Sequence, residues 1–356
     1  MPAALLCVTN RCRSVHRFCT LASGSGASGG EARRGVFLPV TPPPPPPLGR
    51  SRRKDALLLD PALDDTELSA SVDALAHGRW VRVRTLLADT GTDWDLRGHR
   101  LVVLAEGPAS AAWAGDWRLA EPDSADAATL LACALVFQAV RGKSSGDAAR
   151  EACRLAAAMA PHDPTPWLGM LILARRTGTP DEREHAFDQV RARHPDHHHA
   201  HHLMAACLAE QQQGGADDPL HQVYDFAYWA AEQAPADSPL AILPVVAHAE
   251  RYRALAAAGL EPADPAASGH WSTRRARQVM KAAFDWWLEW EGEDHPRRKV
   301  DLNFLAHAKY HEGRMAEAAA LFHRIGPHVT AAPWSYPDRD ARRAFKAARD
   351  TAFSTA

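Results

Sequence analysis

The sequence predicts an all-α protein: stacked helical hairpins that wind into a right-handed α-α superhelix. Apolar residues recur at helical spacing after Asp60, and no segment alternates with period two for long enough to suggest a sheet. Matching residues recur 34 positions apart, which indicates repeated helical units. With 356 residues the chain exceeds a single compact core, and a stack of repeats is one way to grow past that limit.

The segment before the repeats is expected to be helical. Acidic and hydroxyl residues can cap its helices, and glycines can end them. The expected elements are a helix from Asp64 to Gly78, one from Trp80 to Gly91, one from Trp94 to Glu106, and a short helical or irregular connector over 111–117.

The clear repeats begin near Ala125. Four matched pairs carry the interval: Cys133 and Trp167, Cys153 and Phe187, Ala156 and Val190, and Pro161 and Pro195. The expected hairpins pair 128–140 with 147–159, 166–176 with 181–193, and 197–212 with 220–233. The third unit is longer, and its Gly/Asp-rich insertion is expected between Gln213 and Pro219. A further helix, 240–257, carries Pro244 in its first turns, where a proline costs least.

Composition divides the chain into three regions. Residues 1–54 hold a Ser/Gly run, six consecutive prolines and a basic cluster, so we expect a disordered tail. Its first 30 residues lack acids, as in an organelle transit peptide; the alternative, which we favour, is a translation start nearer Val36. Residues 55–258 form an N-terminal helical-repeat region, and the loop 259–269 joins it to C-terminal hairpins and a cap over 270–356. The helices expected there are 273–291, 300–312, 315–325 and 338–351.

The second unit resembles the tetratricopeptide repeat. Trp167, Phe187 and Pro195 stand at the Trp, Phe and Pro positions of that signature, and we expect Trp167 and Phe187 to be largely buried in one hairpin. Leu171 and Arg183 replace small residues, so Arg183 implies a wider helix crossing or a side chain that snorkels outward. The last unit keeps the small residues, with Ala306 and Ala318, a turn glycine at Gly313, and Phe322.

The resemblance covers 125–235 well and 300–327 less closely. The chain is also similar to uncharacterised helical-repeat proteins of actinobacteria, from which no activity can be carried over. The tetratricopeptide resemblance implies a concave groove that binds a peptide or a protein helix. In the first two units this face would use exposed first-helix residues, namely Gln138, Arg141, Arg175 and Arg176.

Charge and cysteine usage exclude several classes of protein. The net charge of −2 and pI near 6.8 argue against a general binder of nucleic acid or anionic membranes. No apolar run reaches about 18 residues, so no membrane span is expected. Cys133, Cys153 and Cys207 lie in alanine-rich helical patterns, where a reduced cysteine acts as a small apolar residue. No CxxC pair is present. We expect a cytoplasmic protein, of an oligomeric state that the sequence does not indicate.

Histidines form the most concentrated polar cluster, from His194 to His202. On a helix His198 and His202 share a face, as do His197 and His201, and such pairs can chelate zinc, nickel or copper. A closed site needs further ligands, and none stands at a diagnostic spacing. We therefore expect a solvated helix start with weak affinity for nickel or zinc, and we predict no metal ligand and no cofactor.

Two other features have an ordinary explanation. In the segment 286–290 three tryptophans continue a stripe through Met280 and Ala283, which predicts contact with neighbouring helices; the alternative is an aromatic patch that binds a partner. His162-Asp163, and His295 with Glu293-Asp294, occupy turns beside prolines and make no catalytic set.

We therefore predict no catalytic residue. The predicted function is a protein–protein interaction scaffold or adaptor. The alternatives are a ligand- or metal-responsive regulatory sensor on the same scaffold and an enzyme whose site has no recognised motif.

Overall fold

The computed structural model describes residues 56–211, 221–290 and 295–355, and within these ranges it contains fifteen α-helices and no β-strand. The all-α prediction is confirmed for them. The α-helices are α1 (Thr66–Ala76), α2 (Trp80–Thr90), α3 (Trp94–Ala105), α4 (Ser110–Ala120), α5 (Ala125–Val140), α6 (Gly146–Met159), α7 (Thr165–Thr177), α8 (Pro180–Arg191), α9 (His198–Ala209), α10 (Gln222–Gln233), α11 (Leu243–Ala257), α12 (Arg274–Trp290), α13 (Arg298–His311), α14 (Met315–Ile325) and α15 (Ala341–Thr355). Three short 3-10 helices are η1 (Pro239–Ile242), η2 (Pro265–Ala267) and η3 (Gly269–Ser272). The predicted tail and the predicted insertion at 213–219 lie outside the described residues.

Local side chains explain many helix boundaries. Thr179 and Glu182 form a reciprocal capping box at the start of α8, which satisfies two backbone N–H groups that the helix leaves unpaired. Gly313 has φ +83°, a left-handed conformation that glycine adopts without strain, and it makes the turn between α13 and α14. These short-range signals are visible in the sequence, which is why α14 begins and ends where predicted.

Residues 111–117 belong to a full helix, α4, and not to a short connector. Trp117 within it is completely buried, and its ring stacks on that of Trp80 at 5.6 Å between centroids. Burial of the large Trp117 side chain stabilises the helix that carries it. Tertiary packing therefore favours a full helix here, although the local sequence pattern predicts one only weakly.

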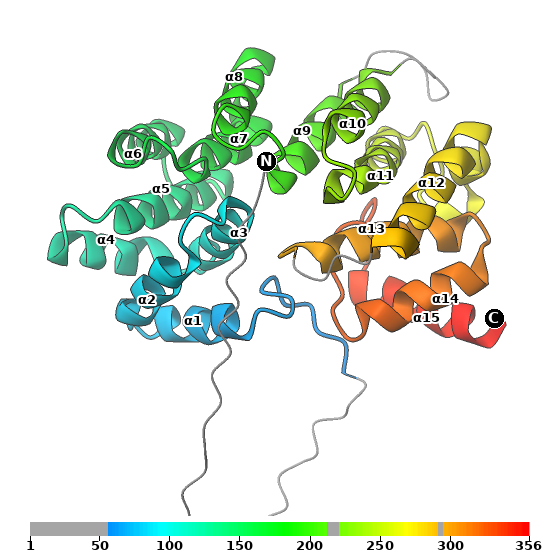
Figure 1. The fold of residues 1–356 in the computed structure, drawn as a ribbon, viewed down its shortest axis with the longest axis horizontal. Helices are drawn as coiled ribbons and strands as arrows, with labels where there is room; N and C mark the ends of the chain where they lie inside the picture. The colour runs from blue at the N-terminus through cyan, green and yellow to red at the C-terminus, as the bar shows by residue number, and fades with distance from the viewer. Residues whose placement is uncertain (1–55, 212–220, 291–294, 356) are drawn as a thin grey trace, which may run out of the picture. The chain divides into compact units, whose positions relative to one another are not determined.

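Consecutive helices pack on one another in superhelical order (Figure 1). Hairpins form between α5 and α6, α7 and α8, and α13 and α14, and successive odd-numbered helices from α1 to α13 also contact one another. α3 additionally contacts α9. α9 and α13 both pack against α11, and His198 of α9 contacts Asp301 of α13. These two helices are therefore neighbours in space although about 100 residues separate them in sequence. The segment Arg52–Ala356 forms one compact unit, and the loop 259–269 with η2 lies within it.

The first described segment is tied to the loop that follows α14. Leu58 N donates to Pro327 O at 2.7 Å, and Val329 N donates to Leu58 O at 2.9 Å. These bonds make an isolated parallel bridge between Leu58 and His328. The first described segment is therefore joined directly to the loop between the last two helices of the stack.

The core confirms most of the predicted interior positions. Phe187 is buried, and so are Met280, Ala283 and Trp287 of the tryptophan stripe. The thiols of Cys133, Cys153 and Cys207 are free and buried, as predicted. Leu288, at the border of the stripe, is 55% exposed, and the side chain of Trp290 lies outside the described set.

Trp167 is less completely buried than Phe187, but it packs against the same core cluster, as the prediction of a largely buried residue requires. The Arg193 guanidinium covers one face of its ring at 5.3 Å, and His185 meets the ring edge-on, so side chains of its own hairpin complete the burial. Arg183 is half-buried. It donates to the carbonyls of Ala174 and Gly178, both at 3.1 Å, and so caps the end of α7.

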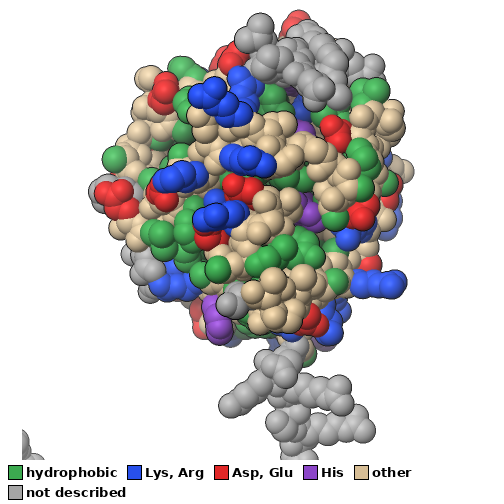
Figure 2. All heavy atoms as spheres, turned by 90° about the vertical axis from the view of Figure 1, so that its right-hand side faces the viewer, with side chains coloured by type: hydrophobic (Ala, Val, Ile, Leu, Met, Phe, Trp, Pro, Cys, Tyr) green, Lys and Arg blue, Asp and Glu red, His purple; other side chains and the backbone are tan. Residues whose placement is uncertain are grey.

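The surface is mixed in character. On the face drawn in Figure 2, acidic and basic side chains are interspersed, and hydrophobic side chains form small groups between them. Exposed ion pairs such as Arg82–Glu67, at 2.8 Å, contribute little to stability. As for membrane association, no described helix combines the length and apolar character that a bilayer crossing requires.

Candidate metal centre

The histidine cluster is buried, so the predicted solvated helix start is wrong. His197, His198, His201 and His202 are at most 7% exposed, and His199 is half-buried. The reason is that α9 begins against α3. Asp95 of α3 accepts a hydrogen bond from the His198 backbone N–H at 2.9 Å and so caps the new helix. The local pattern around the histidines carries no sign of this contact.

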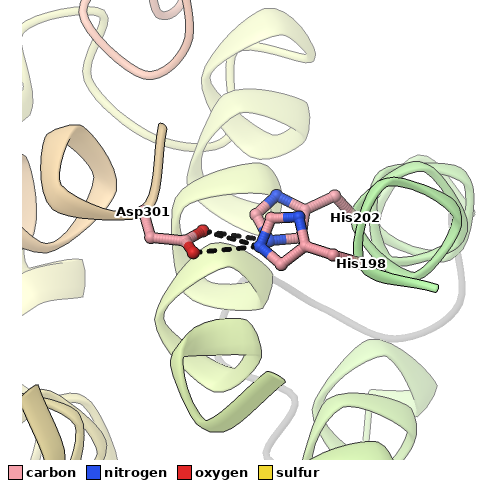
Figure 3. Close-up of side chains that lie close together, drawn as sticks. All are labelled: His198, His202 and Asp301. Carbon is pink, nitrogen blue, oxygen red and sulfur yellow. Dashed lines mark hydrogen bonds and ion pairs between the residues drawn. The ribbon is translucent and has the colours of Figure 1, made fainter. Parts of the chain in front are cut away.

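Two histidines and one aspartate converge from different helices. His198 and His202 stand one turn apart on α9, with ring centroids 4.1 Å apart, and Figure 3 shows both rings directed at the carboxylate of Asp301 on α13. His198 Nε2 lies 2.9 Å and 3.0 Å from the two Asp301 oxygens, and His202 Nε2 lies 3.4 Å from Oδ1. One potential ligand atom from each residue falls within 4.8 Å of the others. Among the described residues this is the only such group of three.

The protonation states of the group suit metal coordination. Burial lowers the pKa of His198 well below its usual value, so the ring is neutral at pH 7. Burial alone would raise the pKa of Asp301, but the neighbouring His198 and His202 outweigh it and lower the pKa, so the carboxylate is ionised. Metal ligands must be deprotonated, and these two donors already are. Asp301 also lies in the first turn of α13, where the helix dipole favours a negative charge.

A second carboxylate organises the side chains around this group. Asp95 accepts from His194 Nε2 at 3.1 Å and lies 3.4 Å from His197 Nδ1. His295 Nε2 is 4.0 Å from Asp95, and the His295 ring centroid is 4.3 Å from that of His198. Burial would raise the pKa of Asp95, but the hydrogen bond from His194 and the nearby histidines lower it. An ionised Asp95 thus interacts with His194, His197 and His295, the histidines that surround the group.

A cavity of about 40 Å³ reaches the group at Asp301. Asp301 and His295 line it together with apolar side chains that include Trp286 and Leu302. This volume can hold a water molecule, which needs roughly 10–15 Å³ measured in this way. A metal ion held by three protein ligands would therefore have space for a water or a small ligand in an open position, as catalytic and exchangeable sites do.

Sequence reasoning singled out two of the three residues of this group, although it predicted no metal ligand. The spacing of His198 and His202 places them on one face, but Asp301 lies about 100 residues away, and only the packing of α9 and α13 against α11 brings it near. One signal was available: Asp301 and Asn303 alternate with the apolar residues Val300, Leu302 and Phe304, and both prove to be buried. Buried polar residues in such a helix point to a partner elsewhere in the fold.

The other candidate positions are structural or exposed. Asp163 is buried, binds Arg97 at 2.7 Å and accepts from Thr165 N at 2.8 Å, whereas His162 is exposed. His295 is half-buried and lies beside His198, while Glu293 and Asp294 are outside the described residues. Of the predicted partner-binding residues, Arg141 and Arg176 are exposed, Gln138 is half-buried, and Arg175 is half-buried in an ion pair with Glu210 at 2.9 Å.

Comparisons with known proteins add no family. A scan against protein-family models finds no match for the chain, and a search of curated proteins finds none either. The resemblance to tetratricopeptide repeats therefore stays a prediction based on the residues quoted above.

Proposed function

We propose that this protein binds a divalent transition-metal ion of the zinc class at His198, His202 and Asp301, and that the ion regulates its helical stack. The observation that supports this proposal is the convergence of two imidazoles and one carboxylate at a buried site. Two nitrogens and one oxygen suit zinc, and the same donor set with open positions also suits iron(II).

The position of the ligands supports a regulatory role. The ion would bridge α9 of the N-terminal repeats and α13 of the C-terminal hairpins, both of which pack on α11. Its binding energy would therefore add to the association of these two regions. An ion that binds only the packed arrangement shifts the population toward it, which is the basis of a metal-responsive scaffold.

We expect zinc to raise the melting temperature of chelator-treated protein. At a free zinc concentration one hundred times the Kd, the stabilisation should be about 2.7 kcal/mol. Asp301→Asn keeps the shape of the side chain and removes its charge, and His198→Asn removes one imidazole. Both variants should lose at least ten-fold in zinc affinity by calorimetry, together with most of the thermal shift.

A matched control lies further along α13. His307 and His311 have the same spacing as His198 and His202, with ring centroids 4.5 Å apart, but no described carboxylate completes a group of three with them. His311→Asn should therefore leave zinc affinity unchanged. The proposal fails if His311→Asn weakens binding as much as His198→Asn does, or if zinc binds the wild-type protein without stabilising it.

A second candidate function, a scaffold that binds a protein partner, is favoured by an exposed aromatic pair. Tyr228 and Trp229 on α10 are 56% and 40% exposed. They border an open cavity of about 320 Å³ that Arg275 and Val279 of α12 also line. Exposed aromatic side chains beside a cavity are typical anchors of protein interfaces.

Partner binding is tested by changes that spare the core. Tyr228→Ala should weaken recovery of a partner purified from the native organism while moving the melting temperature by no more than a degree or two. Arg176→Glu and Arg141→Glu test the face predicted from the repeats in the same assay. Partner recovery that survives all three changes would argue against the scaffold function.

A further inference from the structure

A larger cavity, of about 470 Å³, borders the histidine cluster at His199. The first described segment, α3, the start of α13 and the loop after α14 all contribute to its wall. The apolar part of the wall includes Leu59, Leu63, Val102, Val103, Val300 and Val329. Pockets for small organic molecules measure roughly 300–1,000 Å³ and are mostly apolar, with a few polar groups that orient the ligand.

Three nitrogen-bearing side chains line this cavity: Arg297, His99 and His199. Arg297 Nε and His199 Nδ1 are buried without a hydrogen-bond partner in the described part of the chain. His99 is 2% exposed; the backbone of Ala62 lies near its ring, but neither ring nitrogen makes a hydrogen bond of normal geometry. Buried polar groups in native proteins nearly always have partners, so three unpaired groups around one cavity point to a missing acceptor.

Because Arg297 is positively charged, the acceptor that these groups lack is expected to be an anion. A guanidinium remains protonated in proteins even where burial lowers its pKa, as it does here. Asp95, Asp301 and Glu106 act on it through space, but no ion pair joins it to a described carboxylate. A buried charge without a contact partner is costly, and a carboxylate would supply two oxygens that match the fork of the guanidinium.

The acidic residues that line the cavity do not serve as an anionic partner for Arg297. Asp60 is already engaged, since its oxygens accept from Ala62 N at 2.9 Å and from the Ser69 hydroxyl at 3.2 Å. Burial raises the pKa of Glu106, although the nearby Arg141 and Arg297 oppose this effect, and Glu106 makes no ion pair with Arg297 in the described part of the chain.

We infer that this cavity binds a small amphipathic carboxylate. Its carboxylate would lie against Arg297, with His99 and His199 donating from the side, and its apolar body would cover the valine and leucine wall. The inference does not depend on the metal centre, because His198, His202 and Asp301 do not line this cavity.

Octanoate is a suitable probe, with octan-1-ol and octylamine as probes of the same length without the negative charge. In chelator-treated protein, calorimetry should show saturable binding of octanoate at least ten-fold tighter than that of either control. Arg297→Gln should weaken octanoate at least ten-fold. Arg298→Gln, at the same helix start but lining the other cavity, should leave octanoate binding unchanged.

A second variant keeps the test decisive if Arg297→Gln does not fold. Val102→Phe fills the cavity and leaves all its charges in place, and it should abolish octanoate binding. The inference is overturned if octanol binds as tightly as octanoate, if octanoate does not bind at all, or if the folded Val102→Phe protein still binds it. Because chelator is present throughout, loss of octanoate binding and loss of zinc binding are separate results.

Discussion

Acidification from pH 7 to pH 5 is expected to unfold metal-free protein before most of its carboxylates protonate. Three histidines far from one another in sequence carry this expectation: His99, His248 and His311. Burial lowers the pKa of each to about 3. The charge of Arg297 adds to this at His99, those of His270 and Arg275 at His248, and that of Arg339 at His311.

The direction follows from proton linkage. Between pH 6.5 and about 3 the unfolded chain binds protons at these histidines and the folded chain does not, so stability falls as the pH falls. At pH 5 each histidine should remove about 2 kcal/mol, and three together about 6 kcal/mol. A domain is typically stable by about 5–15 kcal/mol, so a loss of this size is enough to unfold many proteins.

Circular dichroism during an acid titration measures the midpoint. His248→Phe removes one of the three groups and keeps an aromatic ring against Tyr224, whose centroid lies 4.6 Å away, so the midpoint should move to lower pH. His77→Gln, at an exposed histidine, should leave it in place. A wild-type protein that melts at the same temperature at pH 4 and pH 7 would contradict the expectation.

Arg97→Ala is expected to destabilise the protein by roughly 3–5 kcal/mol, the cost of breaking a buried ion pair. The Arg97 guanidinium on α3 donates to Asp163 at 2.7 Å and to Asp126 at 2.5 Å. Asp163 is 2% exposed, so removing the arginine leaves a carboxylate that water cannot reach. Urea denaturation measures the loss as a shift of the midpoint.

Two further variants test the cause. Arg154→Ala removes an exposed partner of Glu151 and should change stability by no more than about 0.5 kcal/mol. Arg97→Met combined with Asp163→Asn removes both buried charges, and it should recover part of the stability that Arg97→Ala loses. If Arg97→Ala costs no more than Arg154→Ala, the buried pair does not hold α3 to the turn before α7.

The sequence predicted the helices better than it predicted the site, because the two depend on different distances along the chain. Helix boundaries follow from residues within one or two turns, such as Thr179 with Glu182 and the turn at Gly313. The spacing of His198 and His202 likewise shows which face they share. It does not show what that face meets, and the cap from Asp95 and the carboxylate of Asp301 come from helices about 100 residues away.

The sequence also did not show which side chain covers Trp167. This residue stands at an interior position of the repeat, and the guanidinium of Arg193 from its own hairpin lies over its ring. The long side chain of Arg193 can reach across the ring, and the period of the repeat does not encode such a reach.

The bridge between Leu58 and His328 changes how the whole stack should come apart. An array of repeats normally frays from its termini, since each terminal unit is held by a single neighbour. Here two backbone hydrogen bonds clip the first described segment to the loop after α14, across 270 positions of sequence. Like a cross-link that spans a long loop, the clip denies the first helices much of the freedom that fraying would release. Melting of the first helices must therefore first open a contact with the loop between α14 and α15, whereas α15, which follows the clip in the chain, can fray without opening it.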